Sequence, residues 1–203
     1  METLSKIFGG EVKVKILRLF LFNQDNHFDL DTIAERVKEN VSKVRKELNN
    51  LERAGFIKKK SVYKGLVKKG KRQIKKFTFT YFLNTNFTYI APLYNLLINS
   101  KPLEPKELSK KISDLGSIKL LIVSGVFTQD KESRVDMLIV GDNVKKASLE
   151  NTIKNIEAEL GKEIKYAFFT LDDFTYRLRM FDKLIRDILD YPHQKIINKI
   201  GNI

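Results

Sequence analysis

Residues 41–54 combine an apolar helical stripe with a face of hydrogen-bond donors. The apolar side chains recur at spacings of 3, 4 and 3, which predicts an amphipathic helix; they are Val41, Val44, Leu48 and Leu51. The donors of the opposite face are Ser42, Arg45, Lys46, Asn49 and Arg53, with Lys43 and Asn50 flanking them. The set expected to face the major groove is Ser42, Lys43, Arg45, Lys46 and Asn49. Arg pairs bidentately with guanine and Asn with adenine in the major groove, while Ser and Lys bind phosphates. This face predicts contacts with double-stranded DNA, and the alternative is an ordinary solvated surface helix.

The residues before this helix indicate how it is positioned. An amphipathic helix is expected over 10–22, and a short helix begins after Asp29, an N-cap candidate. Asn40 is the next cap candidate, and Gly55 can end the later helix in the left-handed conformation. A short helix, a tight turn and a second helix form a helix-turn-helix, in which the later helix enters the groove.

A basic β-hairpin is predicted after this helix. Segments 56–63 and 71–83 have strand character, and Gly65 and Gly70 bound the tip. Its cations are expected to contact phosphates, which positions a protein on DNA without reading its sequence. They are Lys58, Lys59, Lys60, Lys64, Lys68, Lys69, Lys71 and Arg72.

The charge of the chain is concentrated in the same region. The 203 residues carry a formal charge of +13. Residues 1–83 hold 20 Lys/Arg and 9 Asp/Glu, whereas residues 84–203 hold 18 and 16. Residues 53–76 contain 11 Lys/Arg and no acid. The asymmetry indicates a polyanion-binding module joined to a nearly neutral one, and nucleic acid is the expected polyanion.

Residues 12–83 resemble the ArsR/MarR-type winged helix of prokaryotic transcriptional regulators. The resemblance is carried by residues 42–57, a recognition helix that runs into Leu51, two polar residues, alanine-glycine and an apolar pair. It implies a sequence-specific, DNA-binding transcriptional regulator. A homodimer is expected on general grounds, because symmetric dimers present two recognition helices to half-sites about one DNA turn apart.

The rest of the chain predicts a second, α/β module. Strands are expected over 118–127, 134–140 and 163–170, with helices over 104–115, 147–160 and from about 174 to 189. The order β-β-α-β-α favours helices packed on a small sheet. The whole chain is therefore predicted to be α+β, with a winged helix-turn-helix at 1–83, a linker helix at 84–100 and a small α/β domain at 101–203.

This second module resembles a minimal nucleotidyltransferase domain. The matching stretches are 122–127, 135–141, and 181–190 with 199–201. Active members of that family carry a Gly-Ser pair after the first strand and two carboxylates, one residue apart, that bind Mg²⁺ for phosphoryl chemistry. Here the pair is inverted, Ser124-Gly125, and the carboxylate positions fall on Arg134 and Asp136. The resemblance thus implies a degenerate domain without nucleotidyl transfer or catalytic metal.

Two roles remain open for such a domain. Ser124, Gly125, Arg134 and Asp136 form a hypothetical vestigial pocket for a nucleotide or other small effector, with Arg134 binding phosphate. Alternatively the domain serves dimerisation or partner binding. With nucleotidyl transfer lost, Asp136 is expected to be a structural hydrogen-bond acceptor or an ion-pair partner near Arg134, and not a metal ligand. Candidate dimer contacts are Leu19, Phe22, Tyr89, Leu93, Leu96 and Leu97. Two other functions compete with the regulator: an active nucleotidyltransferase and an antitoxin-like protein-interaction module.

Composition excludes several chemistries. There is no cysteine, so disulfides and thiol nucleophiles are absent, and the two histidines, His27 and His193, are far apart. No metal or cofactor is expected. No apolar run reaches the length of a membrane span, and the N-terminus lacks a signal-peptide pattern. We expect a cytoplasmic protein that does not enter the membrane.

Overall fold

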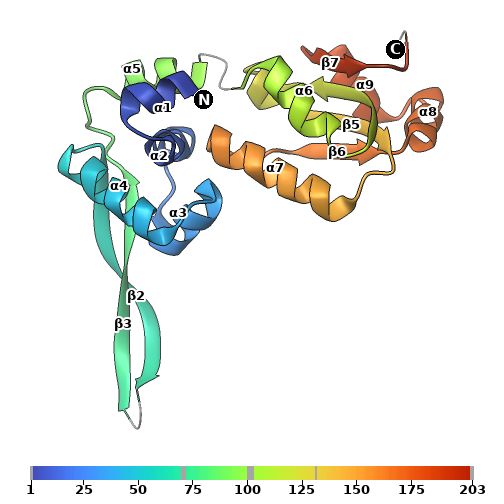
Figure 1. Cartoon of the computed structure of the whole chain (residues 1–203). Helices are drawn as coiled ribbons and strands as arrows, with labels where there is room; N and C mark the ends of the chain where they lie inside the picture. Colours follow the sequence, from blue (N-terminus) through green and yellow to red (C-terminus); the bar gives the residue numbers. More distant parts are fainter. Residues whose placement is uncertain (1, 70–71, 100–102, 131, 202–203) are drawn as a thin grey trace. The chain divides into compact units, whose positions relative to one another are not determined.

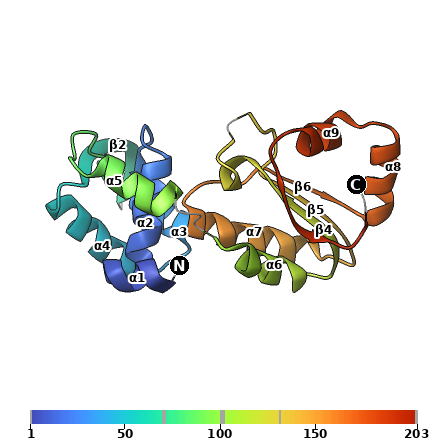
Figure 2. The same cartoon turned by 90° about the horizontal axis from the view of Figure 1, so that it is seen from above.

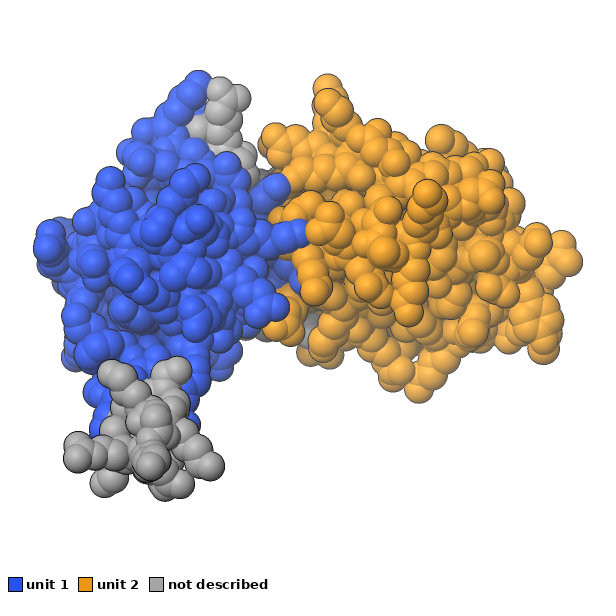
Figure 3. Space-filling view, turned by 60° about the horizontal axis from the view of Figure 1, so that its bottom comes forward, with its two compact units in different colours: residues 1–102, 157–162 blue, residues 103–156, 163–203 orange. Residues whose placement is uncertain are grey.

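The computed structural model describes residues 2–69, 72–99, 103–130 and 132–201. The protein has a mixed α+β fold. Its residues form two compact units, which Figure 3 colours separately. Unit 1 comprises Met1–Pro102 with Glu157–Lys162, and unit 2 comprises Leu103–Ile156 with Glu163–Ile203.

Unit 1 is built on a central buried helix, α2 (Glu11–Phe22), whose side chains from Val14 to Leu21 are all buried. Around it lie α1 (Glu2–Phe8), α3 (Leu30–Val37), α4 (Val41–Arg53), α5 (Ile90–Tyr94) and the π-helical turn η1 (Asn95–Asn99). The helices expected over 10–22 and 41–54 and the short helix after Asp29 are confirmed. Helix α1 was not predicted, because so short a segment shows no clear period.

A three-stranded antiparallel sheet completes unit 1. Its strands β1 (Phe28–Asp29), β2 (Ile57–Lys69) and β3 (Arg72–Leu83) lie in the order β1-β3-β2. The predicted hairpin is confirmed, and Figure 1 shows it projecting well beyond helices α3 and α4. Its register shifts between Tyr63 and Gly65, so that Lys64 is an extra residue opposite no partner.

Residues 157–162 pack against α2 inside unit 1. The buried Arg18 guanidinium donates to the carbonyl oxygens of Leu97 at 3.0 Å and Glu159 at 2.8 Å. Asn23 Nδ2 donates to the Gly161 carbonyl at 2.9 Å. Burial lowers the pKa of Arg18 to about 10, so it stays charged at neutral pH. The two carbonyls therefore solvate a cation that is cut off from water.

The predicted linker at 84–100 belongs largely to the core of unit 1. Leu97 and Ile98 are buried in the same hydrophobic cluster as Leu19 and Phe20. Leu19 and Leu97 were candidate dimer contacts, and this expectation is wrong because both side chains are consumed within the unit. Tyr89 and Leu96 remain exposed.

Unit 2 contains a four-stranded sheet in the order β6-β5-β4-β7. These strands are β4 (Ser117–Val123), β5 (Met137–Asp142), β6 (Tyr166–Phe169) and β7 (Gln194–Asn198). Only β5 and β6 are parallel. The helices are α6 (Pro105–Ser113), α7 (Lys146–Leu160), α8 (Leu171–Arg179) and α9 (Lys183–Asp190), with a 3₁₀ turn, η2 (Gly125–Phe127).

Helices cover both faces of this sheet. Figure 2 shows α6 and α7 on one side of the strands and α8 and α9 on the other. Leu120 and Ile122 of β4 pack in one core cluster with Phe174 and Ile185 of the α8–α9 layer. The next residues along β4, Leu121 and Val123, are also buried, so the strand is apolar on both faces.

Several predicted boundaries in unit 2 were wrong. The strand expected over 118–127 ends at Val123, because Ser124–Phe127 turns away as η2. The strand expected from Arg134 begins only at Met137. Strand β7 was missed, because its sequence, Gln194–Asn198, has too few apolar residues to stand out. In the described part of the chain, helices long and apolar enough to cross a membrane are absent.

Candidate nucleic-acid interface

The outer face of α4 is continuously exposed and carries donors. All five predicted side chains are exposed, as are Asn50 and Arg53 beside them; the five are Ser42, Lys43, Arg45, Lys46 and Asn49. Val44, Leu48 and Leu51 form the buried stripe opposite. Val41, predicted to complete that stripe, is 37% exposed, because it begins the helix and lies at the edge of the core. The structure thus presents these donors together on one surface.

Both ends of α4 are closed by local hydrogen bonds. Asn40 Oδ1 accepts from the Ser42 backbone N–H and from the Ser42 hydroxyl, each at 2.8 Å. At the other end Gly55, with φ +79°, donates to Glu52 O, and Phe56 donates to Leu51 O. This pair of bonds is the Schellman arrangement that left-handed glycine permits. The caps predicted at Asn40 and Gly55 are confirmed, and they fix where α4 begins and ends.

The acidic side chains of α4 lie off this face and are paired. Glu47 forms an ion pair with Lys13 of α2 at 3.4 Å. Glu52 forms one with Lys59 of β2 at 2.9 Å. Their negative charges are therefore neutralised within unit 1, and the outward face of α4 keeps a net positive charge.

The hairpin lysines fall into two groups. Lys58 and Lys60 are exposed and point from the same face of β2, since strand side chains alternate. Lys59 points from the other face, toward Glu52 and over the Phe79 ring, with its Nζ 5.5 Å from the ring centroid. Lys58 and Lys60 are thus the best placed of the three for phosphate.

Lys64 was expected to contact phosphate, but in the structure it pairs with an aspartate of its own unit. Its Nζ lies 2.7 Å from Asp29 Oδ2, and Asp29 is also the N-cap of α3, where it accepts from the Thr32 N–H at 2.9 Å. The Lys64 hydrogen bond and then the Thr32 bonds lower the pKa of Asp29 to about 2. Lys64 therefore fastens the hairpin to α3, and its charge is already partnered.

The remaining hairpin cations extend toward the tip. Lys68 and Lys69 lie in β2 and Arg72 begins β3, but the structure describes only their backbones. Lys71 lies outside the described residues. Their phosphate contacts stay a prediction.

Sequence reasoning missed the exposed aromatic side chains of the hairpin. Tyr63, Phe77 and Phe79 are large and open to solvent. The segment around them was interpreted only as strand, because aromatic residues favour strands whether or not they are buried.

In unit 2, Ser124, Gly125 and Asp136 come together as predicted, but their polar atoms bond to one another and to backbone. Asp136 is 8% exposed. Its Oδ1 accepts from the Val126 N–H at 2.8 Å and its Oδ2 from the Lys165 N–H at 2.9 Å. The buried Ser124 hydroxyl donates to Pro192 O at 2.8 Å. Asp136 is a structural acceptor that joins two loops, one of the two roles expected for it once its acidic partner is replaced by Arg134.

Gly125 makes this arrangement sterically feasible. Its φ is +52°, and a Cβ at that position would lie 2.2 Å from Asp136 Oδ1. A glycine is therefore required for the carboxylate to reach the Val126 amide.

Arg134 pairs with a residue of α9 and not with Ser124, Gly125 or Asp136. Its Nε lies 2.9 Å from Asp187 Oδ2 of α9, and its side chain is largely exposed. Arg134 and Asp136 also precede β5 and do not project from one strand as the carboxylate pair of the resembled family would. Of the four predicted pocket residues, Ser124, Gly125 and Asp136 are thus held together by hydrogen bonds and close packing, whereas Arg134 is paired with α9.

The described residues offer little for cofactor chemistry. Within them, no group of three His, Cys, Asp or Glu side chains is arranged to hold a metal ion. A shallow depression of about 350 Å³ lies beside α6 and β7, lined by Pro105, Lys106, Ser109, Lys110 and Ile196. None of these is a predicted pocket residue.

Comparison with known proteins does not assign the chain to a family. The chain matches no family model, and neither a curated protein nor a solved structure is significantly similar to it. Its function must therefore be inferred from the surfaces above.

Proposed function

We propose that the protein is a sequence-specific, DNA-binding transcriptional regulator in which unit 1 acts as a winged helix. The observation that carries the proposal is the outer face of α4, where five donor side chains are exposed together and the helix's acids are paired elsewhere. A lysine-bearing hairpin follows directly in the chain. A helix with this surface fits the major groove, and a hairpin beside it reaches the backbone.

Each group has a role set by its chemistry. Arg45 and Asn49 lie one turn apart on α4 and offer the bidentate donors and acceptors that distinguish base edges. Ser42 lies in the first turn, where the positive end of the helix dipole favours phosphate, and its hydroxyl oxygen is held there by the bond it donates to Asn40 Oδ1. Lys58 and Lys60 neutralise phosphates without reading sequence.

We propose that unit 2 resembles a nucleotidyltransferase domain in which the reaction is lost. Both carboxylate oxygens of Asp136 already accept backbone N–H groups, and Arg134 is paired with Asp187. A metal ion would have to share these oxygens with backbone N–H groups that already hold the carboxylate in place, and Arg134 offers a cation where the resembled family has its other carboxylate. Unit 2 then contributes dimer, partner or effector contacts, and Tyr89 and Leu96 of unit 1 are the remaining candidates among the expected dimer contacts.

The test is fluorescence anisotropy of the full chain with its own upstream DNA and with a scrambled duplex, at several salt concentrations. We expect a preference of about 10³ or more for the upstream sequence and affinity that falls steeply with salt. Equal affinity for both duplexes would contradict sequence-specific regulation at that site.

Two kinds of variant distinguish residues that recognise the base sequence from residues that contact phosphates only. Arg45→Ala or Asn49→Ala should cost about 1–3 kcal/mol and relax specificity, whereas Lys60→Ala should weaken all sequences alike and lower the salt slope by about one. Lys154→Ala, which removes an exposed lysine of α7, is the matched control. A loss of sequence preference in Lys60→Ala would reverse these assignments.

The two competing functions have direct assays. Transfer of a radiolabelled nucleotide to protein or RNA would establish the enzyme alternative. Stable capture of a protein partner after nuclease treatment, together with no DNA binding at moderate salt, would favour the antitoxin-like module.

A further inference from the structure

Three aromatic rings stand exposed on the hairpin. Tyr63 is 50% exposed, Phe77 59% and Phe79 52%. Tyr63 and Phe77 are cross-strand partners, with ring centroids 5.7 Å apart and planes tilted by 60°. Because the two rings are not stacked face to face, they do not cover each other.

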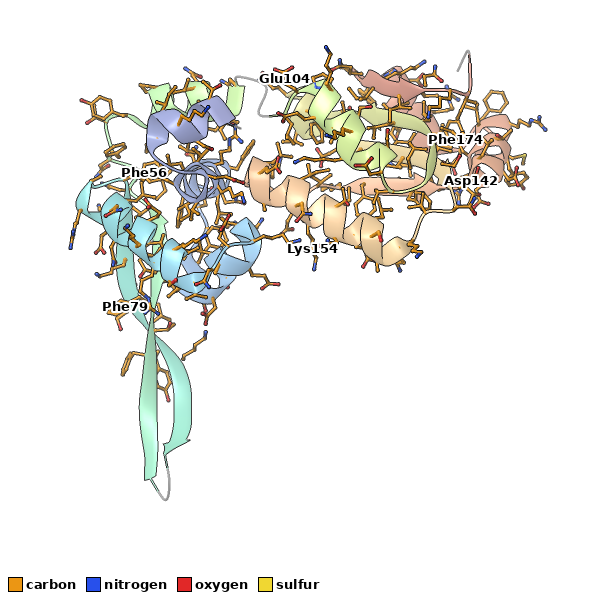
Figure 4. All side chains as sticks on the ribbon, viewed as in Figure 1. Phe56, Phe79, Glu104, Asp142, Lys154 and Phe174 are labelled. Carbon is orange, nitrogen blue, oxygen red and sulfur yellow. The ribbon has the colours of Figure 1, made fainter. Side chains whose placement is uncertain are left out.

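The strand register places all three rings on one face. Ile57 pairs with Leu83, Ser61 with Phe79 and Tyr63 with Phe77, and alternate residues of a strand share a face. Near the helices this face covers the core, where Ile57, Tyr81 and Leu83 are buried. Farther out the same face continues past the helices and carries Tyr63, Phe77 and Phe79, each at least half exposed. Figure 4 labels Phe79 where the hairpin leaves the helices.

The surroundings of the rings select an anionic ligand with flat apolar parts. Lys59 lies over the Phe79 ring, and residues 57–76, which form most of the hairpin, have 10 Lys/Arg and no acid. Two such hairpins would repel each other, and an acidic peptide would not need three exposed rings. Nucleic acid supplies both charge and ring faces.

Unpaired bases fit better than paired ones. In an intact duplex each base is covered above and below by its neighbours, so a ring can stack only on a base that has left the helix. Aromatic side chains beside a basic track are the arrangement by which proteins hold single strands.

We propose that Tyr63, Phe77 and Phe79 form a stacking platform for unpaired DNA bases next to the duplex bound by α4. The inference rests on the proposed function, because α4 is the element that holds the duplex beside the hairpin. The preferred ligand is thus a junction of duplex and single strand, such as a locally melted or frayed segment.

The first experiment compares three labelled DNAs with the full chain by anisotropy. They are a blunt duplex, the same duplex with a short single-stranded oligothymidine overhang, and the same duplex with an abasic overhang of equal length. The two overhangs carry the same phosphates, so only the bases differ. We expect the thymidine overhang to raise affinity about 5-fold or more over the abasic one. Equal affinity for both overhangs overturns the proposal.

Variants locate the effect on the platform. Phe77→Ala and Phe79→Ala should each remove most of the gain from the thymidine overhang and leave blunt-duplex affinity within about 2-fold. Phe79→Tyr should keep the gain. Val62→Ala is the matched control, since Val62 is exposed on the opposite face of the same hairpin. A loss of the gain in Val62→Ala equal to that in Phe79→Ala argues against a one-sided platform.

A spectroscopic test uses the absence of tryptophan from the chain. In Phe79→Trp the single indole reports directly on the platform. Stacking should quench its fluorescence with the thymidine overhang and not with the abasic one. Unchanged fluorescence with both overturns the proposal, and so does a change from dimer to monomer in Phe77→Ala without any change in overhang affinity.

Failure of the proposed function has a different signature. If Arg45→Ala lowers blunt-duplex affinity while bases in the overhang add nothing, the stacking platform is rejected and duplex binding by α4 is supported. If no duplex binds but free oligothymidine still quenches the fluorescence of Phe79→Trp, duplex binding by α4 is rejected. The rings then stack on bases without a bound duplex, which overturns the proposed preference for a junction.

Discussion

Asp29 joins two elements through one carboxylate. It caps α3 through Thr32 and holds Lys64 of the hairpin at 2.7 Å. The Lys64 bond is the main reason that the pKa of Asp29 falls to about 2, with the Thr32 bonds next. A carboxylate with a lowered pKa stabilises the fold in its ionised form, so this contribution is present above the unfolded value of about 4 and is lost as pH falls toward 2.

We therefore expect wild-type stability to fall between about pH 4 and 2, with Asp29 accounting for about 1 kcal/mol after solvent screening at this partly exposed site. Asp29→Asn keeps a cap acceptor and removes the ion pair, so its unfolding free energy should depend less on pH. Asp29→Ala should lose about 1 kcal/mol more at neutral pH, for want of a cap. Urea unfolding across this pH range measures both, and identical pH profiles of wild type and Asp29→Asn would refute the assignment.

Asp136 serves unit 2 in a comparable way, because its two oxygens satisfy the amides of Val126 and Lys165. Asp136→Asn keeps a single oxygen acceptor and leaves one of these amides unpaired. We predict a loss of about 1–3 kcal/mol in unfolding free energy, with DNA affinity unchanged in the folded protein. Asp173→Asn, at an exposed position of α8, is the control. Stability equal to the wild type would mean that Asp136 is replaceable and free for ligand binding.

At the scale of elements, α4 shows how local signals place an exposed surface of hydrogen-bond donors. Its buried and exposed faces follow from a 3.6-residue period, and its ends follow from Asn40 and Gly55. The hairpin differs, because its length and strand character were evident while the placement of its side chains was not. Whether a strand residue is covered depends on how far the hairpin extends past the helices.

Gly55 tests the end of α4. Its φ is +79° and a Cβ there would meet nothing within 4 Å, so Gly55→Ala adds backbone strain alone. We expect a loss of about 1 kcal/mol in thermal or urea unfolding. Gly55→Asn should lose less, since Asn tolerates the left-handed conformation. An Ala variant as stable as the wild type would show that the helix can end otherwise.

At the scale of the whole chain, unit 1 is not one continuous segment. Residues 157–162 pack on α2, where the Glu159 carbonyl solvates Arg18 across a sequence separation of 141 residues. A Cβ on Gly161 would lie 2.5 Å from backbone atoms of Arg18 and Leu19. This close approach makes the distant segment part of the fold that presents α4.

Gly161→Ala should therefore destabilise unit 1 more than Gly55→Ala does. The two glycines have nearly the same φ, +81° for Gly161 and +79° for Gly55, so an alanine is expected to bring similar backbone strain at either position. The two variants differ in the steric clash of the added Cβ, which occurs only at Gly161. We predict a loss of about 2–4 kcal/mol for Gly161→Ala in urea unfolding. Equal losses in the two variants would indicate that residues 157–162 can leave α2 at little cost.

Much of this molecule could be derived from local patterns. The α2–α4 helices, the caps at Asp29 and Asn40, the hairpin and the donor face of α4 all follow from periods and turn chemistry within about a dozen residues. The structural role of Asp136 followed from the loss of its acidic neighbour to Arg134. Each of these depends on interactions that are short along the chain, so the residue order is sufficient to specify them.

Other features appeared only once the chain was folded. Lys64 meets Asp29 over 35 residues and Arg18 meets Glu159 over 141, and no local pattern chooses such partners. The burial of Leu19 and Leu97 and the exposure of Phe77 and Phe79 depend likewise on which elements pack over them. Hydrophobic side chains of one type can fill a core or face solvent, and packing geometry decides which. Hydropathy along the sequence does not contain that geometry.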